Sequence, residues 1–269
     1  MSVEHIRNRS LIEWVGARTL KGGAYLIDVI TLVVHAAYEL AMVWRRDRRE
    51  ALQVISRQLL FTGVDALPVV SVIALMLGLI VITQAGTQLP LLGAEKLIGN
   101  VVVIVVIREL GPLLTAFIVI WRSGTAITIE LGNMRVAQEV TALELMGIPV
   151  VRFVVMPRLA GMALAMLCLT FYFDVVAVLG GFLVARLELV VPFAAFARSV
   201  VQTLSSLDVI VTVFKSVLFG TIVAAFGCYH GLAVERSSTE VPQQTTKAMI
   251  NSVTVCLLVD VLVAFAAYS

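Results

Sequence analysis

The sequence predicts an all-α integral membrane protein, and three observations indicate this class. Hydrophobic residues make up 60% of the 269 residues, charged residues only 14%, and the mean hydropathy is +1.00. A soluble domain has about 25% charged residues. Several apolar runs approach or exceed the ~20 residues with which a helix crosses a bilayer. Charged residues nevertheless occur inside those runs, and because a charge in hydrocarbon is costly, each should face a partner, a cavity or a substrate.

The first sixty residues are predicted to form an N-terminal segment with one amphipathic helix. Within the apolar stretch 24–44, Asp28, His35 and Glu39 lie at spacings of seven and four, so they form one polar line along a helix. An arginine cluster follows (Arg45, Arg46, Arg48, Arg49 and Arg57), and such clusters favour the cytoplasmic face. We expect this helix to lie in the headgroup plane. A sixth span, with its polar line turned toward the bundle, is the alternative.

Residues 61–269 are predicted to form a single domain of five spans. Hydropathy places these spans at about 65–85, 98–121, 158–185, 208–230 and 248–267. With the arginine cluster inside the cell, the connections 122–157 and 231–247 lie inside, and 86–97 and 186–207 lie outside. The chain has no internal repeat, and five spans do not divide into equal halves. One copy is therefore not expected to enclose a pathway alone, and we predict a symmetric homodimer.

Charged residues inside the spans are the principal candidates for a functional site. With ~1.5 Å of rise per residue they fall in one layer, from the middle of the bilayer to its outer half. They are Arg108, Glu109, Asp174, Lys215 and Asp260. Two interpretations remain open: an ion-pair network that orients the helices, or a cavity lining that meets a polar or charged substrate. Pro112 should kink the helix beside two of these charges, either as a packed kink or as a hinge.

The connection between the second and third spans reads as a short cytoplasmic helix, at about 133–147. Asn133 is a candidate N-cap, Gly147 a candidate C-terminal stop, and Pro149 prevents continuation. One apolar stripe is formed by Val136, Val140 and Leu143, while the charged residues Arg135, Glu139 and Glu144 lie elsewhere on the helix. Such a helix can pack on the bundle or bind a soluble partner.

The composition and motifs exclude several other functions. No P-loop sequence occurs, so the chain is not expected to bind nucleotide phosphates, and the net charge of +2 gives no basis for binding nucleic acid. The three histidines form no plausible catalytic site with Ser and Asp. The cysteines (Cys168, Cys228 and Cys256) lack C-x-x-C or His pairing. We therefore predict a chain that is not an enzyme and has no metal site or cofactor of its own.

Two long stretches resemble a known family. Residues 108–161, which begin RELGPLLTAF, and residues 215–232, KSVLFGTIVAAFGCYHGL, resemble MlaE/YrbE-type permeases, the membrane subunits of bacterial ABC lipid transporters. The resemblance implies a homodimer in the bacterial inner membrane that moves phospholipid between the inner and outer membranes. It also implies a cytoplasmic ATPase that binds ATP and Mg, a periplasmic ring of MCE-domain proteins and a small STAS-domain protein.

The resemblance also implies roles for particular residues. The 133–147 connection matches the coupling helix that docks on the ATPase. Four of the five charged residues, all except Asp174, match the family's motif positions near the lipid cavity. Arg108 and Lys215 are candidate headgroup contacts, since a phosphate needs cationic donors. Candidate contacts to the lipid tails lie on one side of the first span and are Leu75, Leu79 and Ile82.

Two other classes of function compete with this interpretation. An ion- or proton-coupled carrier would use the buried carboxylates as a relay and would need no ATPase. A membrane scaffold would anchor peripheral subunits, and neutralising its intramembrane charges would leave transport intact.

Overall fold

The structure of the protein is a computed structural model. It describes residues 25–43, 56, 59–60, 62–91, 93, 97–185, 193–235 and 237–268. Most of these residues are helical and none of them forms a strand, which confirms the predicted all-α class. The arginine cluster and the first 24 residues lie outside the described residues, so the interpretations that depend on them remain predictions.

Six of the described helical paths are long and apolar enough to cross a membrane. They are Tyr25–Val43, Val64–Leu91, Ile98–Val136, Val151–Leu183, Ser206–Leu232 and Glu240–Ala267. The last five correspond to the five predicted spans, the third ending at Leu183 where 185 was predicted. The sixth candidate is the N-terminal helix, which meets the same criterion of length and composition, so these criteria alone do not reduce the count to the predicted five.

The second of the predicted spans extends far beyond its expected end. Its 39-residue path contains α4 (Ile98–Val102), η3 (Val103–Leu110), α5 (Gly111–Val119), η4 (Ile120–Gly124) and α6 (Thr125–Val136). At ~1.5 Å per residue the path measures about 58 Å, roughly twice the hydrocarbon thickness. The prediction of a loop from residue 122 was therefore wrong. Hydropathy placed the end of the span at about residue 121, but η4 continues the helix in π-helical form.

The first and third predicted spans cross closely through small residues. The first consists of η1 (Val64–Ala66) and α3 (Leu67–Leu91), and the third of η5 (Val151–Val155), α8 (Met156–Val175), η6 (Val176–Gly180) and α9 (Gly181–Ala185). A Cβ atom on Gly78 would collide with the backbone of Ala177, and one on Gly181 with the backbone of Gly78. Glycine therefore allows the two backbones to meet, as small residues do between membrane helices.

A short helix, α10 (Phe193–Thr203), occupies part of the connection predicted as the loop 186–207. The prediction missed it because α10 is too short to span a bilayer. Its buried Phe196 stacks on Phe182 with 4.6 Å between ring centroids, and Thr203 hydrogen-bonds Asn100 of α4. The helix therefore packs on the ends of the second and third spans.

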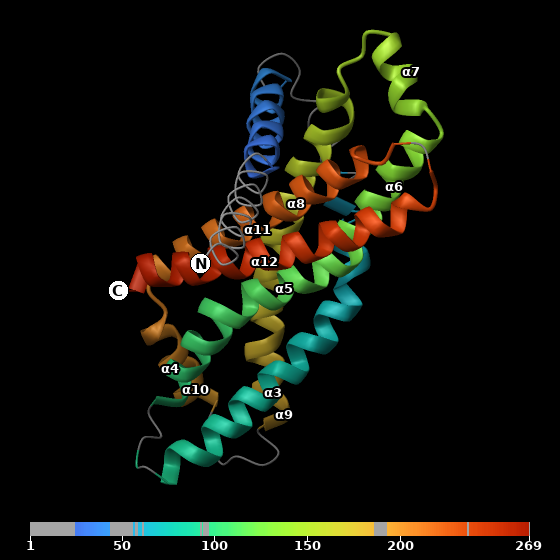
Figure 1. Ribbon diagram of the computed structural model, residues 1–269. Helices are drawn as coiled ribbons and strands as arrows, with labels where there is room; N and C mark the ends of the chain where they lie inside the picture. The colour runs from blue at the N-terminus through green and yellow to red at the C-terminus, as the bar shows by residue number, and fades with distance from the viewer. Residues whose placement is uncertain are drawn as a thin grey trace, which may run out of the picture.

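The fourth and fifth predicted spans are α11 (Ser206–Leu232) and α12 (Glu240–Tyr268). Helix α11 passes beside α8, α12 and α6, and Figure 1 shows it in the middle of the bundle. Gly220 lies against the backbone of Met162 in α8, and Gly231 lies against Leu131 in α6. The core of the protein is therefore assembled around α11.

Tyr25, in the Tyr25–Val43 helix, forms hydrogen bonds with residues of α11 and α12. The Tyr25 hydroxyl donates to Nε2 of His230 (2.7 Å) and accepts from Nδ2 of Asn251 (2.8 Å), while Nδ1 of His230 lies 2.9 Å from Oε1 of Gln244. These bonds are consistent with a neutral His230 that carries its proton on Nδ1. Val29 packs below this polar cluster against Phe226.

The connections between the spans gather at two opposite ends of the bundle. The α6–α7 region and the turn from α11 to α12 lie at one end, whereas α4, α9 and α10 gather at the other (Figure 1). The two connections predicted to lie inside therefore share an end, as do the two predicted to lie outside.

The predicted 133–147 helix begins later than expected. Helix α7 spans Glu139–Leu145, and its N-cap is Gln138, at φ 61°, instead of Asn133. Asn133 lies within the last turn of α6, because the chain remains helical to Val136. The predicted C-terminal stop is confirmed, since Gly147 has φ +75°. The Gly147 N–H donates to the Glu144 carbonyl and the Ile148 N–H to the Leu143 carbonyl, both at 3.0 Å, as in a Schellman motif.

Candidate functional site

The buried ammonium group of Lys215 connects three of the predicted charges. Nζ lies 3.0 Å from Oε2 of Glu109 and 2.9 Å from Oδ1 of Asp260, and it donates to the backbone carbonyl of Arg108 at 3.2 Å. These contacts join α11, α12 and η3. The contacts to Glu109 and to the Arg108 carbonyl are hydrogen bonds, and the contact to Asp260 is an ion pair.

Arg108 belongs to a second ion pair that the sequence analysis missed. Its Nε lies 2.8 Å from Oδ1 of Asp208, and its Nη2 donates to Oδ2 of the same carboxylate at 3.1 Å. Asp208 is fully buried and also accepts from the backbone N–H of Ser205, which completes a capping box at the start of α11. The sequence contained a signal for this residue, since Ser205 and Asp208 have the spacing of a capping box before an apolar run.

We call these five residues the ion-pair cluster: Arg108, Glu109, Asp208, Lys215 and Asp260. Its members differ in their access to the surface of the protomer. The Lys215 side chain is 0% exposed, whereas those of Arg108 and Glu109 are 21% and 34% exposed. Because the Lys215 side chain is enclosed and its ammonium group already contacts two carboxylates and a carbonyl, Lys215 holds the cluster together and is poorly placed to meet a headgroup. Arg108 and Glu109 form the accessible rim.

Asp174 does not join the cluster. It lies 7% exposed in α8, and its Oδ1 packs against Gly111, where a Cβ atom would collide with it. Among the described residues that oxygen has no hydrogen-bond partner. Asp174 instead lines a hollow of about 320 Å³ beside α8 and α11. The predicted layer of five charges is therefore divided into a cluster and a separate carboxylate.

The three candidate tail contacts of the first span have different environments. Ile82 is 1% exposed within the core, whereas Leu75 is 39% exposed and Leu79 is partly buried. Only Leu75 and Leu79 therefore remain accessible to a lipid from outside the protomer.

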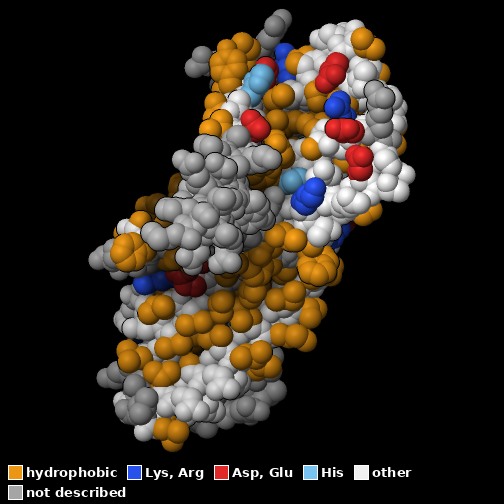
Figure 2. Space-filling model, in the orientation of Figure 1, with side chains coloured by type: hydrophobic (Ala, Val, Ile, Leu, Met, Phe, Trp, Pro, Cys, Tyr) orange, Lys and Arg blue, Asp and Glu red, His pale blue; other side chains and the backbone are white. Residues whose placement is uncertain are grey.

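Helix α7 turns its apolar stripe inward. Val140 is buried and Leu143 packs against the core, while Arg135 and Val136 belong to the end of α6. The outward side carries Glu139, Glu144, Leu145 and Met146. Figure 2 shows charged side chains gathered at this end of the molecule and a broad hydrophobic face elsewhere.

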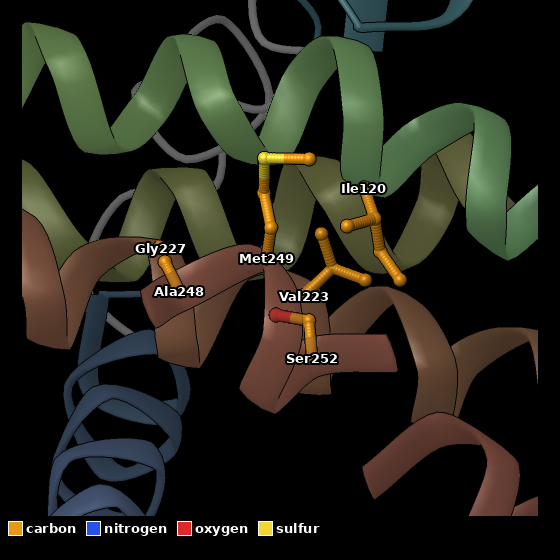
Figure 3. Close-up of a pocket in the computed structure, with 7 residues that line it drawn as sticks. Ile120, Val223, Gly227, Ala248, Met249 and Ser252 are labelled. Carbon is orange, nitrogen blue, oxygen red and sulfur yellow. The ribbon is translucent and has the colours of Figure 1, made fainter. Parts of the chain in front are cut away.

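Two further hollows differ in what they can hold. Figure 3 shows a crevice lined by Ile120 of η4, Val223 of α11 and Met249 of α12. This crevice has no room for a water molecule. A hollow of about 370 Å³ lies between α5, η4 and α12, beside Phe117 and Trp121, and its lining is apolar apart from Thr254. Within the described part of the chain, no three His, Cys, Asp or Glu side chains are grouped to hold a metal ion.

Long apolar helices with ion pairs buried between them define a multi-pass membrane protein. Comparison with known proteins identifies the family: residues 55–266 match the Permease MlaE family. The chain belongs to the MlaE permease family, and it is a transporter permease.

Individual relatives agree with this assignment. The chain is 35% identical over 212 residues to a protein of Rickettsia prowazekii named "Probable ABC transporter permease protein", a match covering 79% of this chain and 82% of the relative. It is 27% identical over 241 residues to the intermembrane phospholipid transport system permease protein MlaE of Haemophilus influenzae, covering 88% and 92% of the two chains. It is also 26% identical to a chloroplast protein of Arabidopsis thaliana, TRIGALACTOSYLDIACYLGLYCEROL 1, over 79% of this chain and 59% of that one.

Proposed function

We propose that this chain is the membrane subunit of an ABC-type transporter that moves phospholipid between the inner and outer membranes, driven by a separate cytoplasmic ATPase. The observation that carries the proposal is the ion-pair cluster, placed inside the spans of an MlaE-family permease with its rim accessible. The Haemophilus relative is named for intermembrane phospholipid transport, which supports the choice of substrate.

The rim of the cluster is suited to a phospholipid headgroup. Arg108 presents a guanidinium, which binds phosphate oxygens well, and it is held in place by the bidentate pair with Asp208. The Leu75 and Leu79 side chains of α3 supply accessible apolar surface for acyl chains. Lys215 and Asp260 hold α11 and α12 against η3, so they maintain the geometry of the rim.

The working unit is a homodimer in the inner membrane. One protomer leaves Arg108 and Glu109 partly exposed inside the bilayer, where an uncovered charge is costly. A second copy would cover this rim and form a shared cavity, which agrees with the absence of an internal repeat.

The N-terminal helix is proposed to lie in the headgroup plane beside the spans. Its buried side carries Val29, Ala36 and Val43, at successive spacings of seven. A second side carries the polar line of Asp28 and His35, and a third exposes apolar side chains, namely Leu26, Ile27, Ile30, Val34 and Tyr38. A helix with one side on protein, one polar side and one exposed apolar side is suited to the boundary between lipid and water.

Helix α7 is proposed to dock on the ATPase. We call its outward residues the coupling surface: Glu139, Glu144, Leu145 and Met146. The two apolar side chains are 84% and 66% exposed beside two carboxylates, a pattern that a partner with an apolar pocket and a basic rim would bind. An MCE-domain ring and a STAS-domain protein complete the proposed assembly.

The function is tested by purifying the chain with its native partners and identifying the bound lipid by mass spectrometry. We expect phospholipid in the wild-type complex and about a tenfold lower occupancy per assembled complex in Arg108→Ala. Arg122→Ala, which removes an ion pair with Asp65 outside the cluster, is the matched control. Equal occupancy in both variants would reject the headgroup role.

Transport assays then distinguish the competing classes. In reconstituted vesicles, lipid movement should need ATP and the ATPase subunit. Movement driven by an ion gradient alone would favour a coupled carrier. Intact transport after neutralising the cluster would favour a scaffold.

A further inference from the structure

A second candidate binding site lies beside the ion-pair cluster, in the hollow of about 320 Å³ that Asp174 lines. Its volume lies at the lower end of the ~300–1,000 Å³ typical of ligand pockets. The walls come from three separated parts of the chain: Ile107 of η3, the α8–η6 helix and the start of α11. Most of the lining is aliphatic or aromatic, including Phe171, Val178, Leu179 and Leu204.

Two polar residues belong to this otherwise apolar lining, one from each of two helices. Asp174 comes from α8 and Thr212 from α11, and both are more than nine-tenths buried, at 7% and 2% exposure. Neither Oδ1 of Asp174 nor Oγ1 of Thr212 has a hydrogen-bond partner among the described residues. Buried polar atoms are almost always paired, because an unpaired one loses its bonds to water without replacement. Two of them lining one hollow indicate a missing ligand group.

The chemistry of these two oxygen atoms favours a ligand group that donates hydrogen bonds and carries a positive charge. A carboxylate only accepts hydrogen bonds, and a hydroxyl both donates and accepts, so a ligand with several N–H groups satisfies both. The balance of charges around the hollow also favours a cationic ligand. Asp174 and the ion-pair cluster together hold two cations, Arg108 and Lys215, against four carboxylates, Glu109, Asp174, Asp208 and Asp260. Both cations are already engaged by the other three carboxylates, so Asp174 is left without a positive partner.

We propose that this hollow binds the primary ammonium group of an amphiphile, with Asp174 and Thr212 as its hydrogen-bond partners and the aliphatic walls around its chain. The hollow lies within membrane-spanning helices, so the ligand enters from the lipid phase. The ethanolamine headgroup of a membrane phospholipid has this chemistry. The site shares no side chain with the proposed headgroup contact at Arg108, so each can fail without the other.

The test is binding of defined lipids to the full-length protein, delipidated in a non-ionic detergent and observed by native mass spectrometry. Three probes carry identical acyl chains: phosphatidylethanolamine, phosphatidylcholine and phosphatidylglycerol. Phosphatidylcholine keeps the positive charge but has no N–H donor, and phosphatidylglycerol has no cation. We expect phosphatidylethanolamine to bind about tenfold more tightly than either, because charge-assisted hydrogen bonds form only with it.

Matched variants assign this preference to the hollow. Asp174→Asn preserves the shape of the side chain and removes its charge, so it should abolish the tenfold preference. Thr212→Val preserves shape and removes the hydroxyl, so it should reduce the preference about threefold. Asp65→Asn, an exposed carboxylate outside the hollow, should keep the full preference. Thermal unfolding of each variant shows whether it is folded, and if one of the pair does not fold, the other decides.

Three outcomes would overturn the proposal. Equal binding of the three lipids to the wild type would show a slot for acyl chains only. A preference that survives in folded Asp174→Asn but is lost in Arg108→Ala would place the ammonium group in the ion-pair cluster. Displacement of the lipid by free ethanolamine at equal concentration would assign a small soluble amine in place of an amphiphile.

Discussion

Lys215 donates a hydrogen bond to the backbone carbonyl of Arg108. In a regular α-helix this carbonyl would accept a hydrogen bond from the N–H of the residue four positions further along, and that residue is Pro112. Proline has no N–H, so in a regular helix the carbonyl at that position would lose its partner. The ammonium group of a neighbouring helix takes this place and at the same time pairs with Glu109 and Asp260. The proline and the charge beside it are therefore parts of one arrangement.

The first prediction concerns the stability that this arrangement provides. Lys215→Met should lower the free energy of unfolding by about 3–5 kcal/mol, because it leaves the buried carboxylate of Asp260 and the half-buried carboxylate of Glu109 without their cation. Thermal unfolding in detergent measures the loss, and Lys247→Met, an exposed lysine of α12, is the control with little expected effect. Adding Asp260→Asn to Lys215→Met should recover part of the stability. A double variant as unstable as the sum of the two single losses would contradict the pairing.

The close crossing of the first and third spans gives a second prediction. Gly78→Ala should destabilise the protein by about 1–3 kcal/mol, because the added Cβ meets the backbone of Ala177, which cannot move aside as a flexible side chain can. Gly63→Ala is the matched substitution, since a Cβ there meets nothing within 4 Å. It should be neutral or slightly stabilising. Similar melting temperatures for the two variants would show that the backbones are further apart.

A third prediction concerns the end of α7. Gly147→Ala should weaken the turn by about 1 kcal/mol, because residue 147 has φ +75° and an L side chain rarely adopts this conformation. Gly147→Asn should lose less, since asparagine tolerates the left-handed region. Limited proteolysis between α7 and α8 reports the change, with the alanine variant cut faster. Space is not the cause here, because no atom lies within 4 Å of the added Cβ.

How far the sequence predicts this structure differs between the core of the bundle and its ends. Charge placement alone brought Arg108, Glu109, Lys215 and Asp260 together, because a charge in a span must find a partner inside the protein. The same argument placed Asp174 in their layer, but depth along a helix does not give the direction in which a side chain points, and Asp174 lines a hollow outside the cluster. Asp208 was missed since it lies at the start of a span, where a charge needs no explanation.

The ends of the helices were harder to predict. Polar residues normally mark the end of a span, but this span continues past Arg122 into α6, because α6 packs on α11 and α12. Hydropathy measures affinity for lipid and does not register a helix that is stabilised by protein contacts outside the bilayer. Gly147, by contrast, was placed correctly because a helix stop depends on local backbone geometry.

The last prediction separates the inward and outward sides of α7. Leu145 and Val140 are both apolar, yet one is 84% exposed and the other 2%. Val140→Ala should lower the free energy of unfolding by about 1–2 kcal/mol through lost burial, with little direct effect on the bound ATPase. Leu145→Glu should leave the melting temperature unchanged and weaken binding of the ATPase about tenfold or more, because a charge then replaces the apolar contact. Leu91→Glu controls for the added charge, because Leu91 is 80% exposed and is the last residue of α3. Binding of the purified ATPase is measured by pull-down and by the rate of ATP hydrolysis. It should be normal for Leu91→Glu and reduced for Leu145→Glu. Normal binding in both variants would show that α7 is not part of the interface.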